Sequence, residues 1–184
     1  DGRKRKFKMT ERLRITQGDV RQVQLAKGAI LSGFYALLKK AGRTMEDLDQ
    51  VMEIEEELFS VPWTKEGFLT FLMKENGMFL VVEEKGRILG YCGLLTVLDE
   101  GDVTNVAVRR DRQREGIGNF LMESMIRLAE ERGITMIHLE VRAGNEAAIR
   151  LYERQGFVRD GLRKGYYTDP TEDAVLMTRT AVSE

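Results

Sequence analysis

Residues 113–118 read Gln-Arg-Glu-Gly-Ile-Gly, and their position between two stretches of different periodicity constrains the fold more than any other feature of the sequence. Before them, alternating apolar residues at 102–108 predict a strand. After them, apolar residues at spacings of three and four predict one buried face of a helix that extends to about Arg132, with Gly133 as its C-cap. The run is therefore predicted to be a loop that leads from a strand into a helix.

A loop at the start of a helix can bind an anion, because unpaired N–H groups and the positive end of the helix dipole face it and glycine lets a phosphate come close. The spacing Gln113-x-x-Gly116-x-Gly118 matches neither the dinucleotide fingerprint nor the ATPase loop. It predicts a pyrophosphate-binding loop of another kind. The alternative is an ordinary strand-to-helix turn with solvated arginines, namely Arg109, Arg110, Arg112 and Arg114.

The chain after this helix repeats the same order of elements. Residues 134–141 predict a buried strand, residues 142–145 a turn, and residues 146–155 a second helix that precedes Gly156 and Phe157. The sequence therefore predicts strand, loop, helix, strand, turn and helix in succession.

Several strings in this region resemble the GNAT superfamily of N-acetyltransferases, and in detail its ribosomal-protein-alanine N-acetyltransferase branch. Residues 113–118 resemble the acetyl-CoA loop of that superfamily. The other strings are Pro62-Trp63, Leu139-Glu140-Val141-Arg142, Asn145-Glu146-Ala147-Ala148-Ile149, Leu151-Tyr152-Glu153, Gly156-Phe157, Gly165-Tyr166-Tyr167 and Glu172-Asp173-Ala174-Val175-Leu176-Met177. The resemblance covers roughly residues 45–180. It implies an α/β protein of the GNAT fold, with a mixed, mostly antiparallel central sheet flanked by helices.

The resemblance also implies acetyl-CoA as cosubstrate, no metal, and a set of residues that would contact the CoA. Loop amides would hold the CoA pyrophosphate. The implied contacts are Val106, Ala107 and Val108 on the strand, Gln113, Arg114, Glu115, Gly116, Ile117 and Gly118 in the loop, and Asn145, which would contact the pantetheine arm or its own helix.

Acetyl transfer to an amine needs a base, because an ammonium group has no lone pair with which to attack a thioester. The resemblance places Glu140 in that role, directly or through water, and Tyr152 in the role of the acid that protonates the CoA sulfur. An amide of the strand at residues 105–108 would stabilise the oxyanion. The alternatives are that Glu140 is an exposed strand carboxylate and Tyr152 a helix-packing aromatic.

The acceptor that the resemblance implies is a protein N-terminus, in detail the N-terminal alanine of a small-subunit ribosomal protein. Trp63, Tyr166 and Tyr167 are the candidates for its pocket, with core packing as the alternative. Two other functions stay open. One is an acetyltransferase of the same fold that acts on lysine or a small amine, and the other is a non-catalytic CoA-binding or protein-binding module.

Composition excludes several function classes. A net charge of −1, from 29 basic and 30 acidic side chains, gives no reason to expect direct binding to nucleic acid or to a membrane. No apolar run approaches the ~18 residues of a membrane span, and the basic residues 3–6 lack the apolar core of a signal peptide, so we expect a cytoplasmic protein. The lone Cys92 predicts a packed thiol. The single His138 predicts a structural histidine, with a proton relay to Glu140 as the alternative.

The middle of the chain is predicted to form two helices and a hairpin. Thr44 and Asp47 have the spacing of a capping box and open the first helix. Its buried face is predicted to consist of Leu48, Val51, Ile54 and Leu58. Residues 64–75 predict the second helix, and residues 78–84 with 87–98 predict the hairpin.

The start of the chain does not fit the GNAT pattern. Residues 14–51 resemble a fragment of the C-terminal ATPase-like domain of the iron–sulfur proteins that reductively reactivate corrinoid enzymes, but the glycine-rich nucleotide loop of that family is missing. No ATP or cluster site is therefore expected. We predict an appended segment at 1–44 and a GNAT domain at 45–184. Within the segment, residues 12–16 would supply the first strand of the sheet and residues 17–41 an extra helix.

Overall fold

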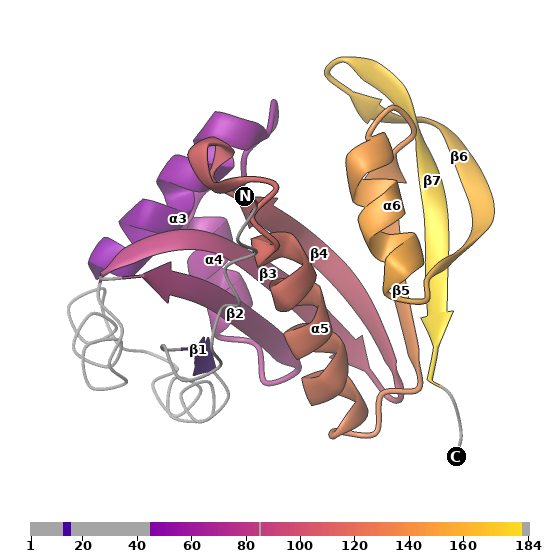
Figure 1. Ribbon diagram of the computed structural model, residues 1–184, viewed down its shortest axis with the longest axis horizontal. Coiled ribbons are helices and arrows are strands. Elements are labelled where there is room, and N and C mark those ends of the chain that lie inside the picture. The colour runs from indigo at the N-terminus through magenta and orange to yellow at the C-terminus, as the bar shows by residue number, and fades with distance from the viewer. Residues whose placement is uncertain (1–12, 16–44, 85, 182–184) are drawn as a thin grey trace, which may run out of the picture.

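A seven-stranded sheet with helices on both faces forms the protein (Figure 1). The structure is a computed structural model that describes residues 13–15, 45–84 and 86–181. Its strands are β1 (Leu13–Ile15), β2 (Gly77–Glu84), β3 (Arg87–Val97), β4 (Glu100–Val108), β5 (Met136–Arg142), β6 (Val158–Thr168) and β7 (Thr171–Thr180). Its helices are α3 (Met45–Leu58), α4 (Lys65–Leu72), the 3-10 helix η1 (Arg110–Arg112), α5 (Ile117–Glu130) and α6 (Glu146–Arg154). The strand order is β1-β2-β3-β4-β5-β7-β6, and only β4 and β5 are parallel neighbours, which confirms the predicted mostly antiparallel sheet.

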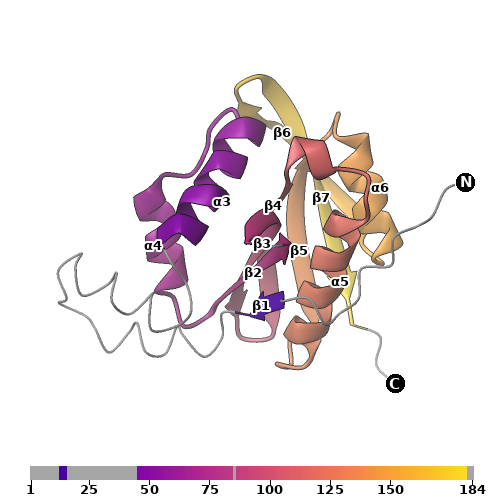
Figure 2. The same ribbon diagram turned by 60° about the vertical axis from the view of Figure 1, so that its left-hand side comes forward.

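The helices form a layer on each face of the sheet (Figure 2). Helices α5 and α6 pack on one face, and α3 and α4 pack on the other. Strand β2 is buried on both sides: Met78 and Leu80 join the core with α5, whereas Phe79 and Val81 join the core with α3 and α4. Because successive side chains of a strand point to opposite faces, a strand covered on both sides is apolar over its whole buried length.

Strands β4 and β5 separate along their length (Figure 1). Their parallel pairing joins residues 100–102 to residues 136–138 and ends there. Strand β4 is also irregular, because Gly93 of β3 faces Asn105 and Leu94 faces Val103, which leaves Thr104 without a partner in a β-bulge. Glycine suits position 93, since an added Cβ would lie 2.5 Å from Thr104 Oγ1 and the Thr104 side chain would have to shift.

Most elements lie where the sequence predicts them. Three residues predicted to be buried in α3 are 6% exposed or less, namely Leu48, Val51 and Ile54. Thr64, the predicted start of the second helix, is the N-cap of α4, and its hydroxyl accepts a hydrogen bond from Gly67 N. The helix ends at Leu72, three residues before the predicted end. Helix α5 ends at Glu130, slightly before the predicted end, and the turn that follows contains Gly133 with a φ of 81°.

The sequence analysis predicted neither β6 nor β7 as a strand, and for β6 the reason lies in its exposure. Nearly every residue of β6 is exposed, because the strand forms the edge of the sheet beside β7. A strand without a buried face has no alternation of apolar and polar residues, and that alternation is the signal from which strands are predicted.

The described part of the N-terminal segment is a single short strand. Strand β1 pairs antiparallel with β2, with Leu13 opposite Val82 and Ile15 opposite Leu80, and so takes the edge position beside β2. The helix predicted over 17–41 lies outside the described residues. The division of the chain at residues 44 and 45 stays a prediction.

Candidate active site

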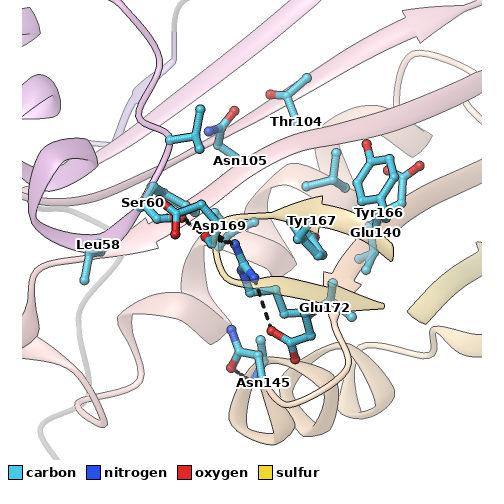
Figure 3. Close-up of a pocket in the computed structure, with 18 of the residues that line it drawn as sticks. Leu58, Ser60, Thr104, Asn105, Glu140, Asn145, Tyr166, Tyr167, Asp169 and Glu172 are labelled. Atoms are coloured by element: carbon cyan, nitrogen blue, oxygen red, sulfur yellow. Dashed lines mark hydrogen bonds and ion pairs between the residues drawn. The ribbon is translucent and has the colours of Figure 1, made fainter. Parts of the chain in front are cut away.

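A cavity of about 650 Å³ lies where β4 and β5 separate (Figure 3). Its walls come from segments far apart in the sequence: the end of α3 and the α3–α4 loop, β4, β5, α6, and the hairpin of β6 and β7. The cavity brings together both predicted catalytic residues, all predicted acceptor residues and two of the predicted CoA contacts. These residues are Trp63, Val106, Glu140, Asn145, Tyr152, Tyr166 and Tyr167.

Glu140 lines the cavity from β5, and its side chain is 34% exposed. Arg163 on β6 donates a hydrogen bond to Glu140 Oε1 at 3.1 Å. The guanidinium carbon of Arg163 also lies 5.0 Å from the centre of the Tyr166 ring. Glu140 is therefore accessible, and an incoming ammonium group would compete with Arg163 for its carboxylate.

Tyr152 lies on α6, which begins after the N-cap Asn145, whose Oδ1 accepts a hydrogen bond from Ala148 N at 3.2 Å. The Tyr152 ring packs 5.9 Å from the ring of Phe157 within the core. Tyr152 also lines the cavity, so the packing role and the acid role are compatible. Burial raises the pKa of Tyr152, and the hydroxyl therefore stays protonated at neutral pH.

Tyr166 and Tyr167 both line the cavity, although neighbouring residues of a regular strand point to opposite faces. The register of β6 with β7 explains this arrangement, because it shifts between Arg163 and Tyr167 and leaves extra residues on β6. Gly165 within this bulge has a φ of 59° and donates its N–H to Asp173 Oδ1 at 2.8 Å. The two tyrosine rings meet edge to face with their centres 5.1 Å apart.

Arg142 connects the α3–α4 loop to the β6–β7 turn. Its guanidinium donates hydrogen bonds to the carbonyl oxygens of Asp169 at 2.8 Å and Pro170 at 3.0 Å, and to Ser60 Oγ at 3.4 Å. The Ser60 hydroxyl donates to the same Asp169 oxygen. The guanidinium carbon also lies 4.2 Å from the centre of the Tyr167 ring. These contacts hold two walls of the cavity at a fixed distance from each other.

Glu55 on α3 also lines the cavity, and the sequence analysis gave it no role. It is 1% exposed and accepts hydrogen bonds from Trp63 N at 3.0 Å, from Asn105 Nδ2 at 3.3 Å and from the Tyr91 hydroxyl. Burial raises the pKa of Glu55, and the bond from Trp63 opposes this effect. A signal was present in the sequence, because Glu55 follows Val51 by four positions and so belongs to the apolar face of the helix.

The charge of the cavity is mostly negative. Four carboxylates line it, those of Glu55, Glu140, Asp169 and Glu172. Two guanidiniums offset part of this charge, because Arg142 pairs with Glu172 at 3.2 Å and Arg163 pairs with Glu140 at 3.1 Å. A concave site lined by one sign of charge attracts an occupant of the opposite sign. This cavity therefore suits a cationic amine better than the phosphates of CoA.

The loop at residues 113–118 favours negatively charged ligands instead. Gly116 is the N-cap of α5 with a φ of 91°; as a glycine it offers no side chain to cap this helix end, and the first turn carries no acidic residue. An added Cβ at Gly116 would meet no atom of the described residues within 4 Å. Gln113 Nε2 donates to Val108 O at 3.1 Å and ties the loop to the end of β4. Uncapped N–H groups at the start of a helix fit a pyrophosphate.

Three of the predicted CoA contacts have side chains that are occupied elsewhere. The side chains of Ala107 and Ile117 belong to the core, at 3% and 2% exposure. The Glu115 carboxylate pairs with Arg112 at 3.0 Å. Ala107 and Ile117 can therefore contact a ligand only through their main chain.

The alternative of a turn with four solvated arginines does not describe this loop. The side chains of Arg109 and Arg112 are 12% and 13% exposed, and they pair with Glu53 at 2.8 Å and with Glu84 at 2.9 Å. Arg114 is exposed and forms no ion pair within the part of the chain that the structure describes. Arg114 is the arginine that remains available to a phosphate.

The other candidates from the sequence have structural roles. His138 Nδ1 lies 2.9 Å from Thr178 Oγ1, and Nε2 lies 3.6 Å from Glu100 Oε2, which favours a structural histidine over a relay to Glu140. Cys92 is fully buried, as predicted, and burial raises the pKa of its thiol.

Within 13–15, 45–84 and 86–181, no group of three or more His, Cys, Asp or Glu side chains could hold a metal ion. None of the described helices has the length and apolar character needed to cross a membrane.

Comparison with protein families gives two matches. The model of the acetyltransferase (GNAT) family matches residues 48–157. The model of the C-terminal domain of RACo, the ASKHA domain, matches residues 3–53, which confirms the second resemblance at the start of the chain.

Relatives and solved structures agree with the first match. A Bacillus subtilis (strain 168) protein provisionally named a ribosomal protein bS18-alanine N-acetyltransferase is 39% identical over 142 residues, which cover 76% of this chain and 94% of that protein. The crystal structure of the ribosomal-protein-S18-alanine N-acetyltransferase from Escherichia coli is similar with a TM-score of 0.69 and 36% identity, over 76% of this chain and 92% of that chain. The crystal structure of Ard1 from Thermoplasma volcanium is also similar, with a TM-score of 0.67 and 27% identity, over 75% of this chain and 93% of that chain.

The family match covers both the loop before α5 and the strands that separate to form the cavity. The chain therefore belongs to the GNAT family of acetyltransferases and is an acetyl-CoA-dependent N-acetyltransferase.

Proposed function

We propose that the protein transfers the acetyl group of acetyl-CoA to the N-terminal α-amine of a protein that begins with alanine, namely a ribosomal protein comparable to bS18. The names of its relatives support this acceptor class. The observation that carries the proposal is that Glu140 of β5 and Tyr152 of α6 line one negatively charged cavity beside β4.

The charge of the cavity favours a free amine as acceptor. An α-amine is largely protonated near neutral pH, so the cavity carboxylates attract it. The product is an amide without charge, and the same carboxylates hold it less strongly. Binding of the substrate and release of the product are therefore both favoured by the same lining.

The proposed reaction uses three groups of the chain. Glu140 takes a proton from the ammonium group, directly or through one water, and frees the nitrogen lone pair. A main-chain N–H of residues 105–108 stabilises the negative charge that develops on the carbonyl oxygen as the nitrogen–carbon bond forms. Tyr152 donates its proton to the sulfur as the carbon–sulfur bond breaks, and its raised pKa keeps that proton in place until then. The nitrogen loses its second proton to water as the amide forms, and Tyr152 regains a proton from water afterwards. Acetyl-CoA, when bound, supplies the acetyl group as a thioester.

The proposed CoA contacts are mostly contacts of the main chain. They are the strand amides of Val106, Ala107 and Val108, the loop residues Gln113, Arg114, Glu115, Gly116, Ile117 and Gly118, and Asn145. The uncapped start of α5 supports the loop contacts.

The N-terminal segment is proposed to be an addition to this domain. The family match at residues 3–53 supports an origin outside the GNAT family. A cytoplasmic location fits a ribosomal protein as acceptor.

A competition among acceptors tests the proposed function. The full chain is mixed with acetyl-CoA, an alanine-starting peptide, an N-blocked lysine peptide and a polyamine, and the products are identified by mass spectrometry. Acetylation of the free alanine end alone is the expected result. Acetylation of lysine or the polyamine instead would favour the small-amine alternative, and CoA binding without any transfer would favour a non-catalytic module.

A further inference from the structure

Glu55 lines the cavity but takes no part in the reaction proposed above. Its carboxylate accepts hydrogen bonds from three different elements: Trp63 N in the α3–α4 loop at 3.0 Å, Asn105 Nδ2 in β4 at 3.3 Å, and the Tyr91 hydroxyl in β3. A carboxylate that is 1% exposed carries a desolvation cost, which the three donors offset in part.

Tyr91 is the most tightly packed residue of the cluster formed by Glu55 and its three hydrogen-bond donors. It is 0% exposed, and its ring stacks on Phe79 with the ring centres 5.5 Å apart and meets Phe68 edge to face at 5.7 Å. A side chain packed in this way cannot move unless the core repacks. Tyr91 therefore holds the Glu55 carboxylate in place on the sheet.

Asn105 depends on this carboxylate because its strand is irregular there. It directly follows Thr104, the unpaired residue at which the register of β3 with β4 shifts. The Asn105 Oδ1 atom is buried and has no hydrogen-bond partner among the described residues. The bond from Asn105 Nδ2 to Glu55 is therefore the contact that orients this side chain.

Trp63 lies at the other end of the cluster. Its main-chain N–H donates a hydrogen bond to Glu55 Oε1, and its ring packs against the ring of Phe68 with the centres 5.2 Å apart. Trp63 also lines the cavity and is one of the residues predicted for the acceptor pocket. Glu55 thus connects a residue predicted for the acceptor pocket to a residue of the strand whose amides are proposed to face the thioester.

We propose that Glu55 is a positioning residue for acetyl transfer, which sets the spacing between the α3–α4 loop at Trp63 and strand β4 at Asn105. This inference rests on the proposed function, because the spacing matters only if an amine on one side attacks a thioester on the other. A misplacement of about 1 Å can lower a reaction rate about 10²-fold.

Two substitutions of Glu55 in the full chain test the proposal. Glu55→Ala removes all three bonds and is expected to lower kcat/KM for the alanine-starting peptide by about 10²-fold. Glu55→Gln can keep the bonds, because its carbonyl oxygen accepts from Trp63 and Asn105 while its amide donates to the Tyr91 oxygen. It is expected to restore kcat/KM to within about fivefold of the unchanged protein. The dissociation constant of CoA should be the same in all three proteins, since no contact of Glu55 reaches the loop at 113–118.

A control separates position from stability. Val51→Ala removes buried methyl groups from the same helix, at a residue that is 2% exposed and does not line the cavity. It is expected to lower the unfolding temperature without lowering kcat/KM. Glu55→Gln is not expected to lower the unfolding temperature, because burial raises the pKa of Glu55 and a neutral amide avoids the cost of a buried charge.

A spectroscopic measurement tests the position of the loop without any turnover. Trp63 is the single tryptophan of the chain, so its fluorescence reports on the loop that Glu55 holds. Glu55→Ala should shift the emission to longer wavelength and increase quenching by acrylamide, whereas Glu55→Gln and Val51→Ala should not.

Several outcomes would overturn the inference. Glu55→Gln as slow as Glu55→Ala would assign the effect to charge and not to position. Full activity of Glu55→Ala, or unchanged Trp63 fluorescence in it, would remove the role altogether. If the unchanged protein acetylates no amine, the proposed function fails, and the fluorescence of the variants still decides whether Glu55 positions the loop.

Discussion

The loop before α5 and the cavity between β4 and β5 are built in different ways. The loop consists of the consecutive residues 113–118 and offers the main-chain N–H groups of an uncapped helix start. The cavity is assembled from side chains of α3, β4, β5, α6 and the β6–β7 hairpin. The loop therefore depends on local conformation, whereas the cavity depends on how distant segments pack.

The two regions also differ in charge. The start of α5 carries the positive end of a helix dipole and the exposed Arg114. The cavity is lined by four carboxylates and one guanidinium. Under the proposed assignment of the two sites, this difference in charge would help to direct the phosphates and the amine to separate places. It follows that substitutions in one region should leave the function of the other intact.

The largest expected effect is that of Glu140→Gln. The substitution keeps the shape of the side chain but removes the proposed base, so kcat for the alanine-starting peptide should fall by about 10²–10⁴-fold. The dissociation constant of CoA, measured by calorimetry, should not change. Glu100→Gln is the matched control, because Glu100 is a half-exposed carboxylate on the neighbouring strand that does not line the cavity. Unchanged turnover of Glu140→Gln would reject Glu140 as the base.

Tyr152→Phe should have the next largest effect. The phenyl ring preserves the packing against Phe157, so the unfolding temperature should stay close to that of the unchanged protein. Loss of the hydroxyl removes the proposed acid and should lower kcat by about 10²-fold. Because burial raises the pKa of Tyr152, the unchanged protein should show no loss of activity from ionisation of this group at any pH up to about 10. A loss centred below that pH that disappears in Tyr152→Phe would contradict this account.

The same contrast explains what the sequence could predict. The strand, loop and helix around residues 113–118 are continuous in sequence, and their periodicity changes where their structure changes, so they were predicted with errors of a few residues. Glu140 and Tyr152 were assigned by resemblance to a family, because no local pattern indicates that β5 and α6 face one cavity.

Other parts of the site could not be predicted, for physical reasons. The bulge that turns both Tyr166 and Tyr167 to the cavity arises from the pairing of β6 with β7, which is a relation between two strands and not a property of either. Glu55 lies on the apolar face of α3, but its use depends on Asn105, which is 50 residues away. Packing between distant elements decides such roles.

Gly116→Ala tests the loop half of the comparison. Gly116 has a φ of 91°, which an alanine adopts only at a cost of about 1–2 kcal/mol, so the loop should distort. The dissociation constant of CoA should rise about tenfold, with little change in kcat at saturating acetyl-CoA. Gly133→Ala is the matched control, because Gly133 has a φ of 81° and follows the other end of α5. An equal loss of CoA affinity in both variants would show that the effect comes from the stability of α5 and not from the loop.

Arg163→Gln should have the smallest effect, and it tests the cavity half. Arg163 pairs with Glu140 at 3.1 Å, with side chains that are 52% and 34% exposed. An ammonium group that approaches Glu140 must compete with this guanidinium. Exposed ion pairs contribute about 0–1 kcal/mol, so the substitution should lower KM for the acceptor peptide by at most about fivefold.

Salt and a second arginine decide whether competition is the cause. Added salt screens exposed charges, so the difference in KM between Arg163→Gln and the unchanged protein should shrink between low and high ionic strength. Arg159→Gln is the control, because Arg159 lies on the same strand and pairs with Glu153 at 2.9 Å outside the cavity. A KM that rises in Arg163→Gln would mean that Arg163 orients Glu140 for the amine and does not compete with it. The cavity would then depend on an ion pair formed across two strands. Its dependence on contacts between distant segments would contrast even more with the loop, which depends on local conformation.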